Sequence, residues 1–137
     1  SLAGILTKSS NVGAIRVSNE LSADHQYDMY RRFGLGQRSG SAFPGELQGV
    51  LTPASSWGPT EKASISYGYG LSVTPLQLAR AYAAVGNKGR LMDVTFVKGS
   101  AGEGTQVIDP AVARQLMDML ETVIGPEGTA RRAAVLG

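Results

Sequence analysis

Ser9 and Asn11 stand one residue apart in the stretch SSN, and both side chains can take part in chemistry. A serine hydroxyl donates and accepts hydrogen bonds, so it can pass a proton to and from a reacting group, and an asparagine amide also does both. Ser9 has no neighbouring base to activate it as a nucleophile. The functional interpretation therefore makes Ser9 an assistant in proton transfer and Asn11 a group that binds substrate.

The same stretch has a structural interpretation, in which Ser10 or Asn11 is the N-cap of a following helix. Serine and asparagine are preferred N-caps because their side chains accept a hydrogen bond from an unpaired N–H of the first turn. Residues two apart in an α-helix point about 200° away from each other. Ser9 and Asn11 can therefore share a target only where the chain leaves helical geometry, and composition alone favours capping.

Hydrophobic spacing predicts the helices that must position this stretch. One short helix, with its apolar residues at helical spacing, is expected before Ser9, and a second is expected after Asn11. Ser22 is expected to cap a third helix that stops at Gly34. Residues 34–70 show no sustained period and are expected to form a long ordered loop.

The second half of the chain has clearer signals. Thr74, Pro75 and Gln77 form the pattern of a capping box, so a helix is expected to start there. Residues 90–108 are rich in strand formers and are expected to form one β-hairpin. Another helix is expected from Asp109-Pro110, with an apolar stripe that runs to Ile124, and a short helical piece is expected over residues 129–134.

Composition excludes several classes of function. The 137 residues are 42% hydrophobic and 18% charged, as in ordinary globular domains, and the net charge of +2 is too small for a nucleic-acid surface. With no cysteine and one histidine, neither a metal site nor a bound cofactor is expected. The glycine-rich stretch GLGQRSG lacks the spacing of a dinucleotide fingerprint.

Four blocks of sequence carry a resemblance to a known family. SSNVG, FGLGQRSGSAFPGE, SYGYGLSVTPLQLARAYAAVGNKG and GTARRAA occur in this order over nearly the whole chain. Together they resemble the transpeptidase domain of class B penicillin-binding proteins, and most closely the cell-division type, penicillin-binding protein 3. The resemblance implies a mainly α fragment of the α/β fold shared by penicillin-binding proteins and β-lactamases, with one possible hairpin around residues 90–108.

In that family the active site combines a nucleophilic serine with lysine three residues on, a Ser-x-Asn motif and a Lys-Thr-Gly or Lys-Ser-Gly strand. By resemblance, Ser9 and Asn11 match the second motif. Ser9 is expected to relay protons, and Asn11 to hydrogen-bond the substrate backbone and help place the lysine. Tyr67 and Tyr69 lie in the segment that resembles the border of the cleft, where they are expected to contact substrate or β-lactam, with packing as their alternative role.

The other two motifs do not occur in this sequence. None of the lysines has a serine three residues before it, and none begins Lys-Thr-Gly or Lys-Ser-Gly. Residues 1–137 are therefore expected to be a partial transpeptidase domain, from just before the Ser-x-Asn motif to just before the third motif. Such an excised piece should be catalytically inactive.

The resemblance also implies partners and a location for the intact parent. The parent is expected to cross-link peptidoglycan stem peptides, to bind β-lactams and to meet membrane proteins of the divisome, with no nucleic-acid partner. It is expected on the periplasmic side of the inner membrane, held by an N-terminal transmembrane helix outside this chain. The fragment, with helix faces uncovered, is expected to self-associate. The alternative is a non-enzymatic helical module in which the glycine-rich middle binds a partner and SSN only caps.

Overall fold

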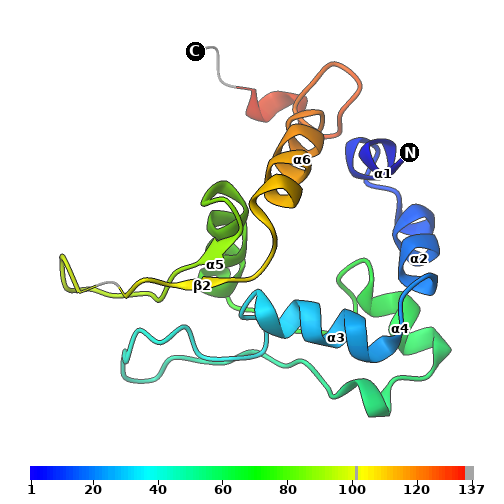
Figure 1. Ribbon diagram of the computed structural model, residues 1–137. Coiled ribbons are helices and arrows are strands. Elements are labelled where there is room, and N and C mark those ends of the chain that lie inside the picture. Colours follow the sequence, from blue (N-terminus) through cyan, green and yellow to red (C-terminus); the bar gives the residue numbers. More distant parts are fainter. Residues whose placement is uncertain (101, 135–137) are drawn as a thin grey trace.

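Helices dominate the computed structural model of the protein, which describes residues 1–100 and 102–134 (Figure 1). Strands β1 (Arg90–Leu91) and β2 (Thr105–Gln106) pair antiparallel, with Arg90 opposite Gln106 and Leu91 opposite Thr105. The mainly helical class and the hairpin within residues 90–108 are both confirmed, although the paired strands are short. The helices are α1 (Leu2–Thr7), α2 (Asn11–Asn19), α3 (Ala23–Arg32), α4 (Pro59–Ile65), α5 (Pro75–Gly86) and α6 (Pro110–Glu121), with 3-10 turns η1 (Ala54–Ser56) and η2 (Arg131–Ala133).

The helix starts that the sequence predicts are formed by side-chain caps. The Ser22 hydroxyl accepts a hydrogen bond from the backbone N–H of His25 at 3.1 Å. Thr74 and Gln77 complete the capping box, because the Gln77 N–H donates to the Thr74 hydroxyl and the Thr74 N–H donates to the Gln77 side-chain carbonyl. The Asp109 carboxylate accepts from the N–H of Ala111 at 2.7 Å. Each cap satisfies backbone donors that the first turn leaves unpaired.

Two expectations about element boundaries were wrong. The segment of residues 34–70, expected to be a long ordered loop with short turns, contains the helix α4 in addition to the short turn η1. Helix α4 begins after Gly58, which provides no side-chain cap, so its start is marked by Pro59 at the first helical position and by Glu61 in the first turn. Helix α6 ends at Glu121, and Ile124 therefore belongs to a loop that covers residues 122–130.

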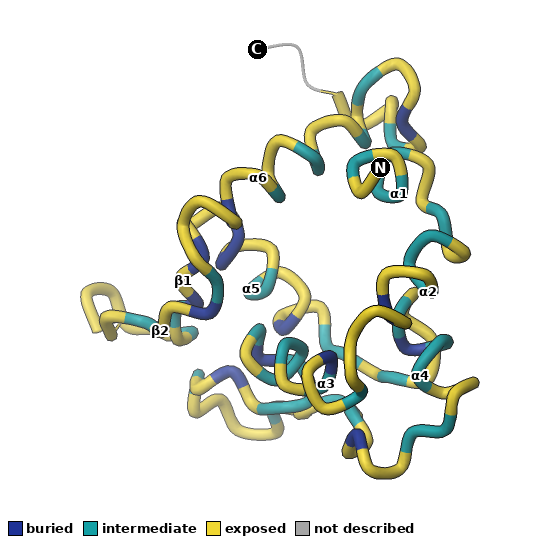
Figure 2. The backbone as a smooth tube through the Cα atoms, turned by 45° about the vertical axis from the view of Figure 1, so that its right-hand side comes forward, coloured by how far each residue is buried: buried dark blue, intermediate teal, exposed yellow. Residues whose placement is uncertain are grey.

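The helices are arranged around an opening (Figure 2). Helix α5 packs on α6, α6 on α1, α1 on α2 and α2 on α4. Helix α3 lies across the remaining side, where the Tyr30 hydroxyl donates to the carbonyl of Ile65 in α4 at 3.3 Å. The Lys62 ammonium donates to the carbonyl of Ser18 at the end of α2.

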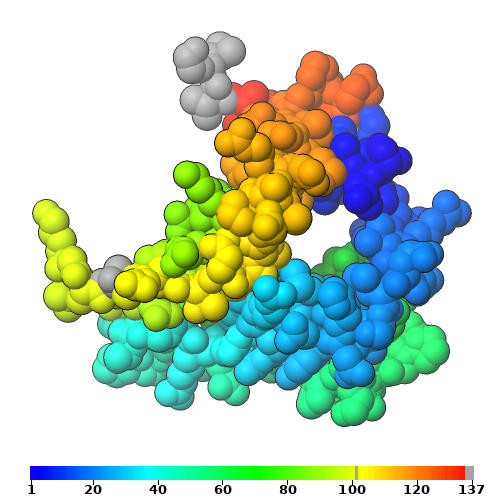
Figure 3. All heavy atoms as spheres, viewed as in Figure 1, coloured from blue at the N-terminus to red at the C-terminus, as the bar shows by residue number. Residues whose placement is uncertain are grey.

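A mainly apolar cavity of about 340 Å³ faces this opening, and Figure 3 shows the hollow between α6, α1, α2 and α3. The fully buried core lies to one side of it, where Ala84, Leu91 and Val107 pack together with the partly buried Phe33. Apolar surface is thus left along the inner faces of the helices. The cavity is lined by Leu2, Ile5, Leu6, Ala14, Val17, Ser18, Leu21, Gln26, Met29, Tyr30, Ser66, Leu116 and Met119.

Gln77 attaches the long glycine-rich segment to helix α5. Its side chain is 1% exposed, and its amide donates to the backbone carbonyls of Gln37 and Gln48. A buried amide with all its hydrogen bonds made holds two separate parts of the loop at once. The approach is close at Gly49, where φ is +67° and a Cβ would lie 2.2 Å from the carbonyl oxygen of Ser72.

We expect Gln77→Met to lower the free energy of unfolding by about 2–3 kcal/mol, because the carbonyls of Gln37 and Gln48 would lose a buried donor. Urea unfolding followed by circular dichroism measures the change. Gln115→Met, at an exposed position of α6, is the matched control and should change stability by less than about 0.5 kcal/mol. Equal stability of the two variants would contradict this account of the loop.

Candidate functional site

The chain leaves helical geometry at Ser9, between α1 and α2. Ser9 has φ +49°, in the left-handed region that residues other than glycine rarely occupy. The Ser9 N–H donates to the carbonyl of Leu6 at 3.0 Å, and the Ser10 N–H donates to the carbonyl of Ile5 at 2.9 Å, so both bonds close the end of α1. The break that Ser9 and Asn11 need in order to share a target is present.

Of the two capping candidates, the structure selects Ser10. The Ser10 hydroxyl accepts a hydrogen bond from the backbone N–H of Gly13 at 3.1 Å. Asn11 is the first residue of α2, and its exposed side chain makes no hydrogen bond to the described part of the chain. Gly13 lets the two helices approach, because a Cβ there would lie 2.6 Å from the Ile5 side chain. Capping therefore leaves Asn11 available for another role.

Ser9, Asn11 and Tyr67 line one cavity of about 650 Å³. Ser9 and Asn11 come from the α1–α2 junction, and Tyr67 comes from the loop after α4. The rest of the lining is mostly apolar and comes from α1, α2, α5, α6 and the loop after α6. A few polar groups on apolar walls are typical of a ligand site. The remaining lining residues are Ile5, Leu6, Ser10, Ala14, Tyr82, Met117, Leu120, Glu121, Val123 and Ile124.

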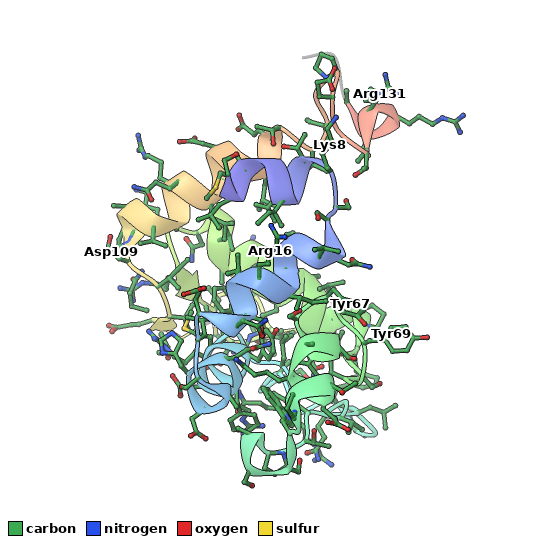
Figure 4. All side chains as sticks on the ribbon, turned by 90° about the vertical axis from the view of Figure 1, so that its right-hand side faces the viewer. Lys8, Arg16, Tyr67, Tyr69, Asp109 and Arg131 are labelled. Atoms are coloured by element: carbon green, nitrogen blue, oxygen red, sulfur yellow. The ribbon has the colours of Figure 1, made fainter. Side chains whose placement is uncertain are left out.

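Tyr69 does not line this cavity. Its side chain is 74% exposed, against 38% for Tyr67, and the two ring centroids lie 6.4 Å apart with their planes tilted by 45°. Figure 4 shows the two tyrosines side by side in the loop after α4. The structure thus brings Tyr67 together with Ser9 and Asn11 and places Tyr69 farther out, against Tyr67.

The loop over residues 122–130 holds the end of α1, which the sequence did not predict. The Lys8 ammonium donates to the carboxylate of Glu127 at 2.8 Å and to its backbone carbonyl at 2.9 Å. By hydrogen bonding first and by its charge second, Lys8 lowers the pKa of the Glu127 carboxyl. The Ser9 hydroxyl lies 3.0 Å from the hydroxyl of Thr129. The sequence block GTARRAA, which contains Thr129, was a signal that this segment matters. It could not show that Thr129 contacts Ser9, which lies 120 residues away in the sequence.

Residues 1–100 and 102–134 contain neither a cluster of metal ligands nor a membrane-spanning helix. Within these ranges, no three side chains of histidine, aspartate or glutamate gather as metal ligands would. No helix there has the length and apolar character to cross a membrane.

We expect Ser10→Ala to lower the free energy of unfolding by about 1 kcal/mol, because it removes the cap of α2. Asn11→Ala is the matched comparison and should cost less than about 0.5 kcal/mol, since its amide does not cap the helix. Urea unfolding of the two variants measures the difference. A larger loss for Asn11→Ala than for Ser10→Ala would show that Asn11 is the structural residue.

The sequence of this chain is similar to those of known transpeptidases. The family model described as "Penicillin binding protein transpeptidase domain" matches residues 1–137. A probable peptidoglycan D,D-transpeptidase, PenA of Neisseria meningitidis, is 42% identical over 135 residues, which cover 98% of this chain and 23% of that protein. The chain therefore spans about a quarter of the length of such relatives.

Solved structures agree with the sequence comparison. The TP domain of penicillin-binding protein 3 from Burkholderia pseudomallei matches with a TM-score of 0.92 and 41% identity, over 98% of this chain and 42% of that one. Penicillin-binding protein 3 from Mycobacterium tuberculosis, complexed with aztreonam, matches with a TM-score of 0.88 and 34% identity, over 100% of this chain and 34% of that one. The helices and the short hairpin thus match part of a transpeptidase structure.

Proposed function

The chain belongs to the penicillin-binding protein transpeptidase family, of the class B penicillin-binding protein 3 type, and we propose that it forms one wall of the active site of a peptidoglycan D,D-transpeptidase. The intact enzyme would cross-link stem peptides through a serine acyl-enzyme. The observation that carries the proposal is the cavity that Ser9, Asn11 and Tyr67 line together.

Ser9 has the position and the chemistry of a proton relay. In acyl transfer the nucleophilic hydroxyl loses a proton as it attacks the carbonyl, and the leaving amine gains one. Ser9 lines the cavity, and its hydroxyl can accept a proton from one group while it donates its own to another. Ser9 would therefore carry the proton between the general base and the leaving or entering amine.

Asn11 and Tyr67 would bind the substrate. The Asn11 amide can donate to a peptide carbonyl and accept from a peptide N–H, which suits an extended stem peptide. Tyr67 offers an aromatic face beside it, and Tyr69 could extend that surface outward. A β-lactam would meet the same side chains, and a relative of this chain binds aztreonam.

The nucleophile and the third motif would come from other parts of a longer parent. The chain spans 23% of PenA, and its sequence has neither a serine three residues before a lysine nor a Lys-Thr-Gly or Lys-Ser-Gly triplet. We therefore propose that the isolated chain is inactive. The parent would act on the periplasmic side of the inner membrane, anchored by its own N-terminal helix among membrane proteins of the divisome.

The partner-binding alternative needs SSN to serve only as a helix cap. In the structure the cap is Ser10, which also lines the cavity, so Ser9 and Asn11 line the cavity without being needed as caps. That division of roles favours the enzymatic interpretation.

We expect Ser9→Ala and Asn11→Ala, made in the intact parent, to lower the rate of acylation by a fluorescent penicillin about 100-fold or more, while the thermal midpoint is retained. Ser55→Ala, in η1 and away from the cavity, is the control and should react as the wild type does. The isolated chain should take up no label. A stoichiometric acyl adduct on that chain, seen by mass spectrometry, would contradict the proposed division of the active site.

We also propose that the isolated chain self-associates, because apolar side chains around the central opening are left uncovered. Leu2 at 58% exposure and Leu21 at 38% are two of them. Light scattering over a range of concentrations should show a mass above that of the monomer. A molecular mass equal to that of the monomer at every concentration would contradict this proposal.

A further inference from the structure

Three successive side chains at the end of α1 hydrogen-bond to a single loop. The hydroxyl of Thr7 pairs with the hydroxyl of Thr122, the ammonium of Lys8 with Glu127, and the hydroxyl of Ser9 with that of Thr129. Figure 4 shows Lys8 between α1 and the loop that leads to η2. The three partners lie within residues 122–130, so this loop holds the end of α1 and Ser9 in place.

The loop is itself closed by short backbone bonds. The Gly128 N–H donates to the carbonyl of Gly125, and the Ala130 N–H donates to the carbonyl of Val123, both at 3.0 Å. Gly128 is buried, and a Cβ there would lie 1.9 Å from the carbonyl oxygen of Val123. Only glycine fits at that contact, so the position of the next residue, Thr129, is tightly determined.

The Ser9 hydroxyl needs such a partner. It is exposed, and an exposed serine samples three staggered positions about its first side-chain torsion. A proton relay works only when its oxygen lies within about 2.6–3.2 Å of the groups that exchange the proton. The hydrogen bond to Thr129 selects one of these positions.

We propose that Thr129 is a positioning residue that holds the Ser9 hydroxyl in its proton-relaying orientation. The inference rests on the proposed transpeptidase function and assigns a role to the fourth sequence block, GTARRAA. A hydroxyl suits this task because it can donate to Ser9 when the Ser9 proton points toward the reacting groups, and accept from Ser9 at other times. A carboxylate could only accept, and would draw the Ser9 proton away from the cavity.

The ion pair between Lys8 and Glu127 has a smaller part. Both side chains are largely exposed, at 58% and 83%, and such pairs contribute little to stability. Lys8 precedes Ser9 in the sequence, but neither Lys8 nor Glu127 hydrogen-bonds to the Ser9 hydroxyl. Orientation of that hydroxyl therefore depends on Thr129.

The test uses the intact parent and measures the acylation rate constant with a fluorescent penicillin together with the thermal midpoint. Thr129→Val keeps the shape of the side chain and removes the hydroxyl, so we expect acylation to slow about tenfold, the equivalent of one hydrogen bond, with the midpoint retained. Thr129→Ser restores the hydroxyl and should react within about threefold of the wild type. Thr60→Val, at an exposed position of α4, is the matched control and should leave acylation unchanged.

A double variant separates positioning from a general loosening of the loop. In the Ser9→Ala background there is no hydroxyl to orient, so adding Thr129→Val should slow acylation no further. A further loss in the double variant, a wild-type rate for Thr129→Val, or a failure of Thr129→Ser to rescue would each overturn the inference. If Thr129→Val does not fold, Thr129→Ala takes its place with the same expectations.

The outcomes distinguish this inference from the proposed function. If Ser9→Ala is impaired while Thr129→Val is not, the proposed function stands and the role of Thr129 is wrong. If the parent is not acylated, or Ser9→Ala reacts as the wild type does, the proposed function fails and the role of Thr129 fails with it.

Discussion

The left-handed backbone of Ser9, with φ +49°, is the constraint on which the rest of the site depends. It ends α1 by turning the Ser10 N–H back to the carbonyl of Ile5, and it frees the Ser10 hydroxyl to cap α2. Asn11 then starts the new helix on the wall of the cavity. For a residue with a side chain this conformation costs roughly 1–2 kcal/mol, which glycine would avoid.

The surroundings of Ser9 offset that cost with contacts from both ends of the described chain. Helix α1 packs on α6, and the loop that follows α6 supplies Glu127 and Thr129 to the neighbours Lys8 and Ser9. The cavity wall therefore depends on packing between segments more than 100 residues apart, and not on the SSN stretch alone. The same arrangement leaves the inner faces of the helices apolar around the opening, where the rest of a transpeptidase domain would be expected to pack.

Local chemistry in the sequence predicted the helix starts well. Ser22, the capping box of Thr74 and Gln77, and Asp109 carry their signal in one or two adjacent side chains, and each cap is formed. Helix α4 was missed because Gly58 gives no side-chain cap and the helix is only 7 residues long. The choice between Ser10 and Asn11 as the cap depends on the left-handed backbone conformation of Ser9, which residue propensities do not predict. The contact of Ser9 with Thr129 joins residues 120 apart, so only tertiary packing could reveal it.

We propose that Ser9 and Asn11 of this junction face the bound substrate, with Ser9 oriented by Thr129 in the loop over residues 122–130. A crystal structure of the intact parent acylated by a β-lactam tests it most directly. We expect a left-handed Ser9 whose hydroxyl lies within hydrogen-bond distance of Thr129 and faces the acylated serine, with the Asn11 amide hydrogen-bonded to the ligand. A structure in which the side chains of Ser9 and Asn11 point away from the ligand would contradict it.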